Sequence, residues 1–313
     1  MTIGLHKLAL LWLIFLLISC ESGNNGTSET DTPTTGKIRI AVDESFKPVL
    51  DTQISTFEAL YKYAKIEPIY TNESDAISKL MEDSVRLIVI PRTLTPEEQQ
   101  PLDKIQLRPR NTKIAYDAVC FIVHPSQKDS TIDVDDVKDI LTGKKTNWAE
   151  INPKHLKAPI QVVFDHRNSS IVRYLIDSLL HGEKITPKAS AVSSTQEVIN
   201  YIAAHPNSLG CIGLAWISDG EDSTSNQFLS KIKVLSVGRK PDFYEPFQYY
   251  LLNAQYPFRR SVYIVSREAR TGLGTGFASF VAGEKGQRII LKADLLPATM
   301  PIRLVELKTK EIQ

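Results

Sequence analysis

The hydrophobic positions along the chain form two kinds of pattern, short continuous runs and helical repeats, and together they predict strands that alternate with helices. Short apolar runs rich in β-branched residues predict strands at residues 37–42, 66–71, 86–90, 114–123, 160–164, 209–216, 231–237, 261–266 and 302–307. Apolar residues that recur at intervals of three and four predict helices at residues 48–65, 76–82, 134–141, 171–180, 196–204 and 275–292. Strands and helices that alternate over this length indicate an α/β architecture with mixed sheets.

The turn at residues 165–170, between one of these strands and the next helix, carries the clearest functional signal. Asn168 and Ser169 are residue types that cap a helix N-terminus. Such a terminus presents free backbone N–H groups and the positive end of the helix dipole. Arg167, Ser169 and Ser170 add a guanidinium and two hydroxyl groups, which are good donors to an anion. The turn therefore predicts an anion-binding site.

The N-terminal residues indicate where the protein works. Residues 1–19 combine a cationic start with the apolar run 8–18, which is too short for a stable membrane span and has the layout of a secretory signal. The segment LISC at residues 17–20 resembles the lipobox of bacterial lipoproteins; an ordinary signal peptide with a chance cysteine is the alternative. We expect lipid modification of Cys20 and a location on the periplasmic side of the bacterial cell envelope. Residues 20–36 lack large apolar side chains, which predicts a flexible tether.

Composition and charge exclude several classes of function. The chain has 37 Lys and Arg residues against 36 Asp and Glu, a formal net charge of +1, and it has no basic run, so nucleic acid is not an expected partner. The six histidines form no His-x-x-x-His pair, and we expect neither a metal nor a cofactor. Cys120 and Cys211 lie in apolar runs, which favours buried free thiols, although a disulfide between them stays open.

A series of segments that runs in order along the chain matches the motifs of one protein family. The most specific is VDDVKDILTGKKTNW at residues 134–148. Further matches are IPRTLTPEE at 90–98, DAVCFIVHP at 117–125, HRNSS at 166–170, LGCIG at 209–213, YPFRRSVYI at 256–264, and GQ at 286–287 with LLP at 295–297. On these segments the chain resembles the PstS-like phosphate-binding family of substrate-binding proteins, which serve ABC importers.

The resemblance implies a type II periplasmic-binding-protein fold. In this fold two α/β lobes are joined by two hinge crossovers, and the ligand is held in the cleft between the lobes. The first lobe would comprise residues 37–115 and 257–313, and the second lobe residues 116–256. Closure of the lobes around the ligand lets a transporter distinguish loaded from empty protein.

The resemblance also implies which residues bind the ligand. The first lobe would supply Ser45, Phe46, Ser74 and Arg92, and the second lobe Arg167, Ser169 and Ser170. The chain departs from the family at Ser170 and Ile171, which stand where the family has glycine and threonine. Asp43 and Glu44 are also unusual, because carboxylates repel an anion unless one of them accepts a proton that the ligand carries. These departures leave open whether the ligand is phosphate or another anion.

The expected function is capture of an inorganic oxyanion, with phosphate as the first choice, and delivery to the permease subunits of an ABC importer. The protein would act as a monomer held to the membrane by its lipid anchor. A binding protein for another anionic solute and a ligand-sensing lobe for a membrane partner are the alternatives. Asp165, His166 and Ser169 resemble a hydrolase triad, but neighbouring side chains on a strand point to opposite faces, so Asp165 cannot orient His166.

Overall fold

The computed structural model describes residues 31–154 and 157–301. The expected signal peptide, Cys20, most of the tether and the strand expected at 302–307 lie outside the described residues. The tether was expected to reach residue 36, but strand β1 (Thr35–Asp43) already begins at Thr35. Asp31, which precedes it, accepts a hydrogen bond from the backbone N–H of Leu273 at 3.0 Å. The end of the expected tether is therefore attached to the folded body.

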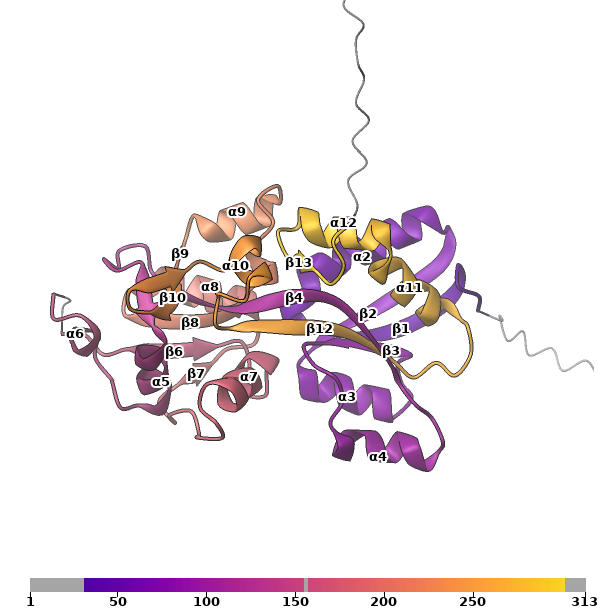
Figure 1. Ribbon diagram of the computed structural model, residues 1–313, viewed down its shortest axis with the longest axis horizontal. Coiled ribbons are helices and arrows are strands. Elements are labelled where there is room, and N and C mark those ends of the chain that lie inside the picture. Colours follow the sequence, from indigo (N-terminus) through magenta and orange to yellow (C-terminus); the bar gives the residue numbers. More distant parts are fainter. Residues whose placement is uncertain (1–30, 155–156, 302–313) are drawn as a thin grey trace, which may run out of the picture. The chain divides into compact units, whose positions relative to one another are not determined.

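The described chain forms two sets of elements that share strand β4 (Arg110–Val123) (Figure 1). We call the first set the first half. It contains β1, β2 (Tyr63–Thr71), β3 (Leu87–Ile90), β12 (Arg259–Ser266), β13 (Leu296–Pro297), the short helix η1 (Glu44–Phe46), α2 (Lys47–Leu60), α3 (Glu73–Met81), α4 (Pro96–Lys104), α11 (Leu273–Ala282) and α12 (Glu284–Lys292).

The remaining elements form the second half. It contains β5 (Thr131–Asp133), β6 (Gln161–Phe164), β7 (Ser190–Ala191), β8 (Ser208–Gly213), β9 (Lys233–Val234), β10 (Ser236–Arg239), β11 (Asp242–Tyr244), α5 (Val134–Thr142), α6 (Trp148–Ile151), α7 (Ser170–Ser178), α8 (Thr195–Ala204), the short helix η2 (Leu214–Trp216), α9 (Ser223–Leu229) and α10 (Gln248–Leu252).

Strand β4 connects the two halves by changing its partner along its length. The sheet order is β2-β1-β3-β12-β4-β8-β6-β7, with β13 and β9 also paired to β4. Residues 110–118 of β4 pair antiparallel with β12, and residues 119–123 pair antiparallel with β8. Strands β1, β2 and β3 pair in parallel, as do β6, β7 and β8. The sheet of each half is thus mixed, and β4 and β12 are the strands at which the chain passes between the halves.

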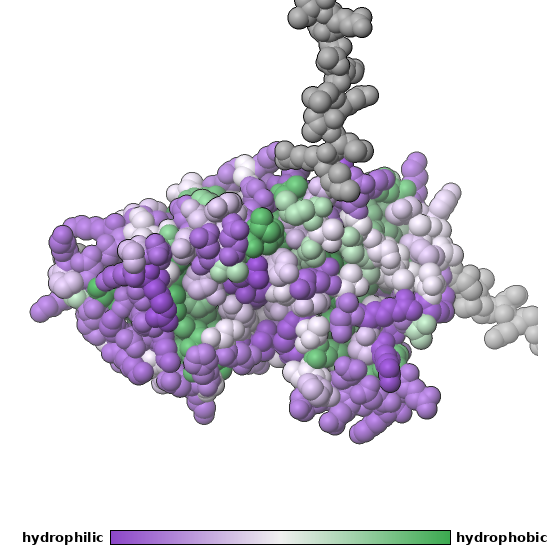
Figure 2. Space-filling model, viewed as in Figure 1, coloured by the Kyte–Doolittle hydropathy of each residue, from purple (hydrophilic) through white to green (hydrophobic). Residues whose placement is uncertain are grey.

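Helices cover both faces of the sheet in the first half. Helices α3 and α4 pack with Ile88, Ile90 and Val265 on one face, and Figure 1 shows them below the sheet. Helices α2, α11 and α12 lie above it, where Phe57 and Phe277 belong to a core that continues into the second half. On the face that Figure 2 shows, hydrophilic residues cover most of the surface and hydrophobic residues form small patches. Burial of strands on both faces explains their continuous apolar runs.

Most expected elements are present, and the differences follow from local backbone chemistry. The helix expected at 48–65 ends at Leu60, and β2 begins three residues later at Tyr63. The strand expected at 209–216 ends at Gly213, where η2 begins, and the strand expected at 231–237 is divided into β9 and β10. The helix expected at 275–292 is interrupted by Gly283, whose extended ψ of 175° ends α11 and starts α12.

The structure shows whether Cys120 and Cys211 form a disulfide bond. Cys120 of β4 and Cys211 of β8 are both buried and free, so the disulfide alternative is wrong. Burial raises the pKa of both thiols, which keeps them uncharged inside the core. In the part of the chain that the structure describes, no helix is long and apolar enough to cross a bilayer.

Gly210→Ala should destabilise the fold by about 1–3 kcal/mol through overpacking. A Cβ at Gly210 would lie 2.8 Å from Cγ1 of Ile122 and 2.8 Å from Cγ1 of Ile202, so α8 would have to move away from the sheet. Chemical denaturation measures the change in unfolding free energy. Gly220→Ala is the matched control, because its Cβ would meet nothing within 4 Å, and equal stability of the two variants would contradict the packing argument.

Candidate functional site

A cavity of about 270 Å³ lies between the two halves, and one of the expected ligand residues, Ser169, lines it. Its lining comes from the ends of β1, β2 and β6 and from the starts of α3, α7 and α8. The lining residues are Asp43, Glu44, Tyr70, Thr71, Asn72, Asp75, Asp165, His166, Ser169, Ser193 and Ser194. Four carboxylates in this set make the cavity acidic, in contrast to the donor-rich site that the resemblance implies.

Capped helix N-termini surround the cavity. The side chain of Asn72 accepts from the N–H of Asp75 at the start of α3, and the hydroxyl of Ser169 accepts from the N–H of Val172 at the start of α7. Ser194 caps α8 through the N–H of Glu197. Each cap satisfies one free N–H and leaves others at the terminus, where the helix dipole favours negative charge. The predicted helix start at Ser169 is confirmed.

A buried arginine lies at the crossing of β4 and β12. Arg260 and Asp117 are paired across these strands, and Arg260 Nε donates to Asp117 Oδ2 at 2.7 Å. Arg260 Nη1 donates to the hydroxyl of Ser170 at 2.8 Å, and its guanidinium lies 5.2 Å from the ring centre of Phe46. Although burial alone lowers the pKa of Arg260, the Asp117 carboxylate raises it above the ordinary value, so the guanidinium stays charged.

Several buried polar atoms around Arg260 have no hydrogen-bond partner among the described residues. They are Arg260 Nη2, Ser45 Oγ, Asp43 Oδ2 and Asp165 Oδ1. A Cβ on Gly213 would lie 3.1 Å from Arg260 Nη2 and 3.2 Å from Ser45 Cβ, which places these two residues beside each other. Buried polar atoms are normally paired, so unpaired donors and acceptors gathered in one place indicate a site for a polar ligand.

Glu44 connects the halves at this site. Its carboxylate accepts from the hydroxyl of Thr195 at 2.6 Å and from the backbone N–H of Thr195 at 3.4 Å, at the first residue of α8. Its backbone carbonyl accepts from Trp216 Nε1 at 3.1 Å. Burial raises the pKa of Glu44 to about 7, and the nearby Asp165 charge adds to the effect. Burial likewise raises the pKa of Asp165 to about 6.

The structure brings together four of the expected ligand residues. Ser45, Phe46, Ser169 and Ser170 are all buried, and Ser45, Phe46 and Ser170 surround Arg260. Their positions follow from the local folds that the sequence predicted, because each lies where a strand gives way to a helix.

The other three expected residues lie elsewhere. Arg92 is held by Glu73 at 2.5 Å and by both carboxylate oxygens of Glu98 at 2.6 and 2.8 Å, so each of its three guanidinium nitrogens already has a carboxylate partner. Ser74 and Arg167 are exposed and do not line the cavity. Their roles as ligand residues therefore remain predictions.

Sequence reasoning did not select Arg260 or Asp117. A signal was present, because Arg260 shares the buried face of β12 with Val262 and Ile264 at a spacing of two residues. Asp117 likewise interrupts the apolar run of β4. A charge on a buried strand face needs a partner, but one sequence does not reveal which carboxylate lies opposite.

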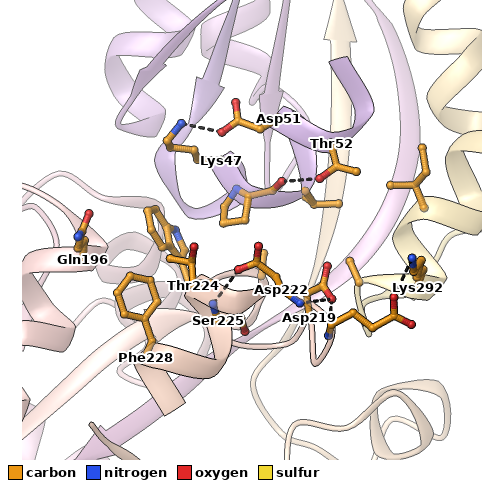
Figure 3. Close-up of a pocket in the computed structure, with 17 residues that line it drawn as sticks. Lys47, Asp51, Thr52, Gln196, Asp219, Asp222, Thr224, Ser225, Phe228 and Lys292 are labelled. Carbon is orange, nitrogen blue, oxygen red and sulfur yellow. Dashed lines mark hydrogen bonds and ion pairs between the residues drawn. The ribbon is translucent and has the colours of Figure 1, made fainter. Parts of the chain in front are cut away.

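A second cavity, of about 610 Å³, lies between α2, α12 and α9 (Figure 3). Its charged side chains are already paired within the chain. Lys47 contacts Asp51 at 2.7 Å, and Lys292 contacts Glu221 at 2.8 Å. Asp222 accepts from the N–H of Ser225 and so caps α9, as Figure 3 shows. None of the expected ligand residues lines this cavity, whereas Ser169 lines the smaller one, and we therefore place the candidate site there.

The triad-like residues differ in exposure. Asp165 is buried, whereas the adjacent His166 is exposed, as strand alternation requires. His166 Nδ1 accepts a hydrogen bond from the backbone N–H of Asn168 at 3.1 Å. In the described parts of the chain, no group of three or more His, Cys, Asp and Glu side chains is placed to hold a metal ion.

Glu44→Gln should reduce the dependence of unfolding free energy on pH. The raised pKa of Glu44 means that its neutral form favours folding: this contribution is complete below the ordinary value of 4.5 and is lost as pH rises through about 7. Glutamine cannot ionise, and its oxygen can still accept from Thr195. Between about pH 5 and pH 8, the unfolding free energy of the variant should therefore rise by roughly 2 kcal/mol relative to that of the parent protein. Denaturant titrations at several pH values measure this.

Glu245→Gln, at an exposed carboxylate, is the control for that series. Its unfolding free energy should follow the parent curve at every pH. If the plot of unfolding free energy against pH for Glu44→Gln is also parallel to that of the parent protein, the conclusion that burial raises the pKa of Glu44 is wrong.

Comparisons with known proteins agree with this geometry. A phosphate-binding protein PstS from Borreliella burgdorferi is 26% identical over 263 residues, which cover 81% of this chain and 87% of the relative. A phosphate-binding protein PstS from Bacillus subtilis is 22% identical over 308 residues, covering 94% and 95%. These matches confirm the resemblance to the PstS-like family.

Solved structures show the same fold. A protein from Clostridium perfringens, assigned as the substrate-binding protein of a phosphate ABC transporter and solved with bound phosphate, has a TM-score of 0.72 and 24% identity, covering 84% of this chain and all (100%) of that one. An ABC-type phosphate transport receptor from Vibrio cholerae has a TM-score of 0.63 and 16% identity, covering 84% and 100%. The expected type II periplasmic-binding-protein fold is confirmed. The model of the PBP superfamily domain matches residues 27–285, and the chain therefore belongs to the PBP superfamily.

Proposed function

We propose that the protein is the substrate-binding component of an ABC importer for phosphate. The observation that carries the proposal is the buried cluster of Arg260, Ser45 and Ser170, next to the cavity that Glu44 and Ser169 line. Arg260 Nη2 and Ser45 Oγ are unpaired donors beside each other, and α7 begins at Ser170. A tetrahedral oxyanion can accept hydrogen bonds from all these groups. Charge-assisted bonds of this kind contribute roughly 1.5–3 kcal/mol each. The names of the PstS relatives support phosphate as the anion.

The acidic lining suits an anion that carries protons. Asp43 Oδ2 and Asp165 Oδ1 are buried acceptors without partners among the described residues. Protonated phosphate can donate hydroxyl hydrogens to these oxygens while its charged oxygens accept from Arg260 and Ser45. A fully ionised anion such as sulfate has no hydrogen to donate and would face unscreened carboxylates. The same groups therefore favour phosphate over sulfate.

Access to the cluster requires the two halves to separate. Arg260 is 3% exposed and Ser45 is 0% exposed, so the anion cannot reach them in the present arrangement. We propose that the halves act as hinged lobes, at residues 37–115 with 257–313 and at residues 116–256, which rotate about β4 and β12. Arg167 belongs to the second half and would change its position relative to Ser45 during this movement, whereas Arg92 and Ser74 would move together with Ser45 as parts of the first half.

The proposed location and partners follow from the N-terminal sequence. A lipid on Cys20 would hold the protein at the bacterial cell envelope, on the periplasmic side, where it meets permease subunits as a monomer. The proposed role is binding and delivery without catalysis. A sensing role for a membrane partner would use the same closure, and loss of phosphate uptake in a strain without the gene would distinguish transport from sensing.

Titration calorimetry tests the ligand. Phosphate should bind in the micromolar range or tighter, because several charge-assisted bonds act together. Sulfate should bind much more weakly, since it cannot donate to Asp43 and Asp165. Absence of heat and of any thermal shift with millimolar phosphate would overturn the proposal. Binding of a different anionic solute under the same conditions would identify the alternative ligand.

Ser45→Ala should weaken phosphate binding by about tenfold and leave stability nearly unchanged. The Ser45 hydroxyl has no partner among the described residues, so its removal breaks no internal hydrogen bond. Calorimetry and thermal unfolding measure the two effects separately. Ser55→Ala, at an exposed serine on α2, is the control and should alter neither. Unchanged affinity in Ser45→Ala would remove Ser45 from the site.

A further inference from the structure

We propose that the ion pair between Glu73 of α3 and Arg173 of α7 is a closure latch, which sets the affinity for the anion from outside the binding cavity. The inference rests on the proposed function, because closure matters only if the cleft holds a ligand. Helices α3 and α7 belong to different halves and lie side by side at the lower edge of Figure 1. Neither Glu73 nor Arg173 lines the cavity.

Glu73 receives one arginine from each half. Arg173 Nε lies 2.8 Å from Oε1 and 3.0 Å from Oε2 of Glu73, and Arg92 Nε lies 2.5 Å from Oε1. The side chain of Glu73 is only 3% exposed, while those of Arg92 and Arg173 are 20% and 29% exposed. A carboxylate buried to this extent is stable only when it is paired, so the closed arrangement depends on these contacts.

The two arginines differ in what holds them. Arg92 is fixed inside the first half, since Glu98 binds its two terminal nitrogens and Glu98 itself belongs to the capping box with Thr95. Burial by itself lowers the pKa of Arg92, but the hydrogen bonds and charges of Glu98 and Glu73 raise it above the ordinary value. The Arg92–Glu73 contact therefore persists whether the cleft is open or closed. Arg92 acts as a positioning residue that aims Glu73 at α7.

Arg173, by contrast, reaches Glu73 only when the halves are together. When they separate, Arg173 keeps its contact with Asp177 of the same helix, at 2.9 Å, and Glu73 keeps Arg92. Opening therefore breaks one charge-assisted contact and leaves neither group without a partner. This makes the latch reversible, since water replaces a single ion pair on each cycle.

The latch acts on affinity through the population of the closed state. When only a fraction of molecules is closed, the apparent dissociation constant is the intrinsic constant divided by that fraction. An ion pair that exists only in the closed state raises the fraction. Its removal weakens binding although no ligand contact is lost.

Arg173→Gln tests the latch in the full chain. The apparent dissociation constant for phosphate, measured by calorimetry, should rise by roughly fivefold to tenfold. Small-angle scattering without phosphate should show a larger radius of gyration than that of the parent protein, and saturating phosphate should restore equal radii. The midpoint of thermal unfolding should stay close to that of the parent. Added salt should reduce the difference in phosphate affinity between the parent protein and the variant, because part of the ion pair is exposed to solvent.

Arg239→Gln is the matched control. Arg239 also forms an ion pair, with Asp135, but both residues lie in the second half, so phosphate affinity and radius should be unchanged. Equal affinity and equal unliganded radii for Arg173→Gln and the parent would overturn the latch. If the parent itself does not bind phosphate, the proposed function fails, and the scattering comparison still decides whether Arg173 holds the halves together.

Discussion

The buried pair of Arg260 and Asp117 is the interaction on which the arrangement of the site depends. It joins β4 to β12 at the place where both strands pass between the halves, and it reaches Ser170 at the start of α7. A charge taken out of water is costly unless it is paired, and loss of one partner leaves the other uncompensated. The pair thus fixes the relative positions of three segments and aims a free N–H group at Ser45. The strands that join the halves and the proposed anion site therefore share one guanidinium.

Carboxylates have two different roles around this arginine. Asp117 and Glu73 are buried with cationic partners and hold elements together. Asp43 and Asp165 are buried, and each has one carboxylate oxygen without a partner among the described residues; burial raises the pKa of Asp165 to about 6. Glu44 differs from both groups, because its donors are the hydroxyl and the backbone N–H group of Thr195 rather than a cation. An acidic cleft with one buried arginine is therefore compatible with an anion that brings its own protons.

The fold was largely predictable because its strongest signals are local. Strands such as β6 and helices such as α7 and α8 appear where periodicity and caps place them, and the family resemblance supplied their connection. Short elements were missed: β5, β7, α6 and α9 contain few residues, so propensity and pattern carry little information there. Breaks such as that at Gly283 were missed because a helical pattern continues across a single backbone change.

The sequence by itself determined the α/β architecture, the family, and the strand–helix junctions that supply Ser45, Phe46, Ser169 and Ser170. These features depend on neighbouring residues, whose spacing and chemistry are visible in one dimension. Only the tertiary structure decided that Arg260 is buried against Ser170 at the start of α7 and that Arg92 is occupied by Glu73 and Glu98. Pairing of charges depends on which side chains meet across strands and helices. Asp117 and Arg260 meet although 143 positions separate them in the chain, and no local pattern encodes that distance.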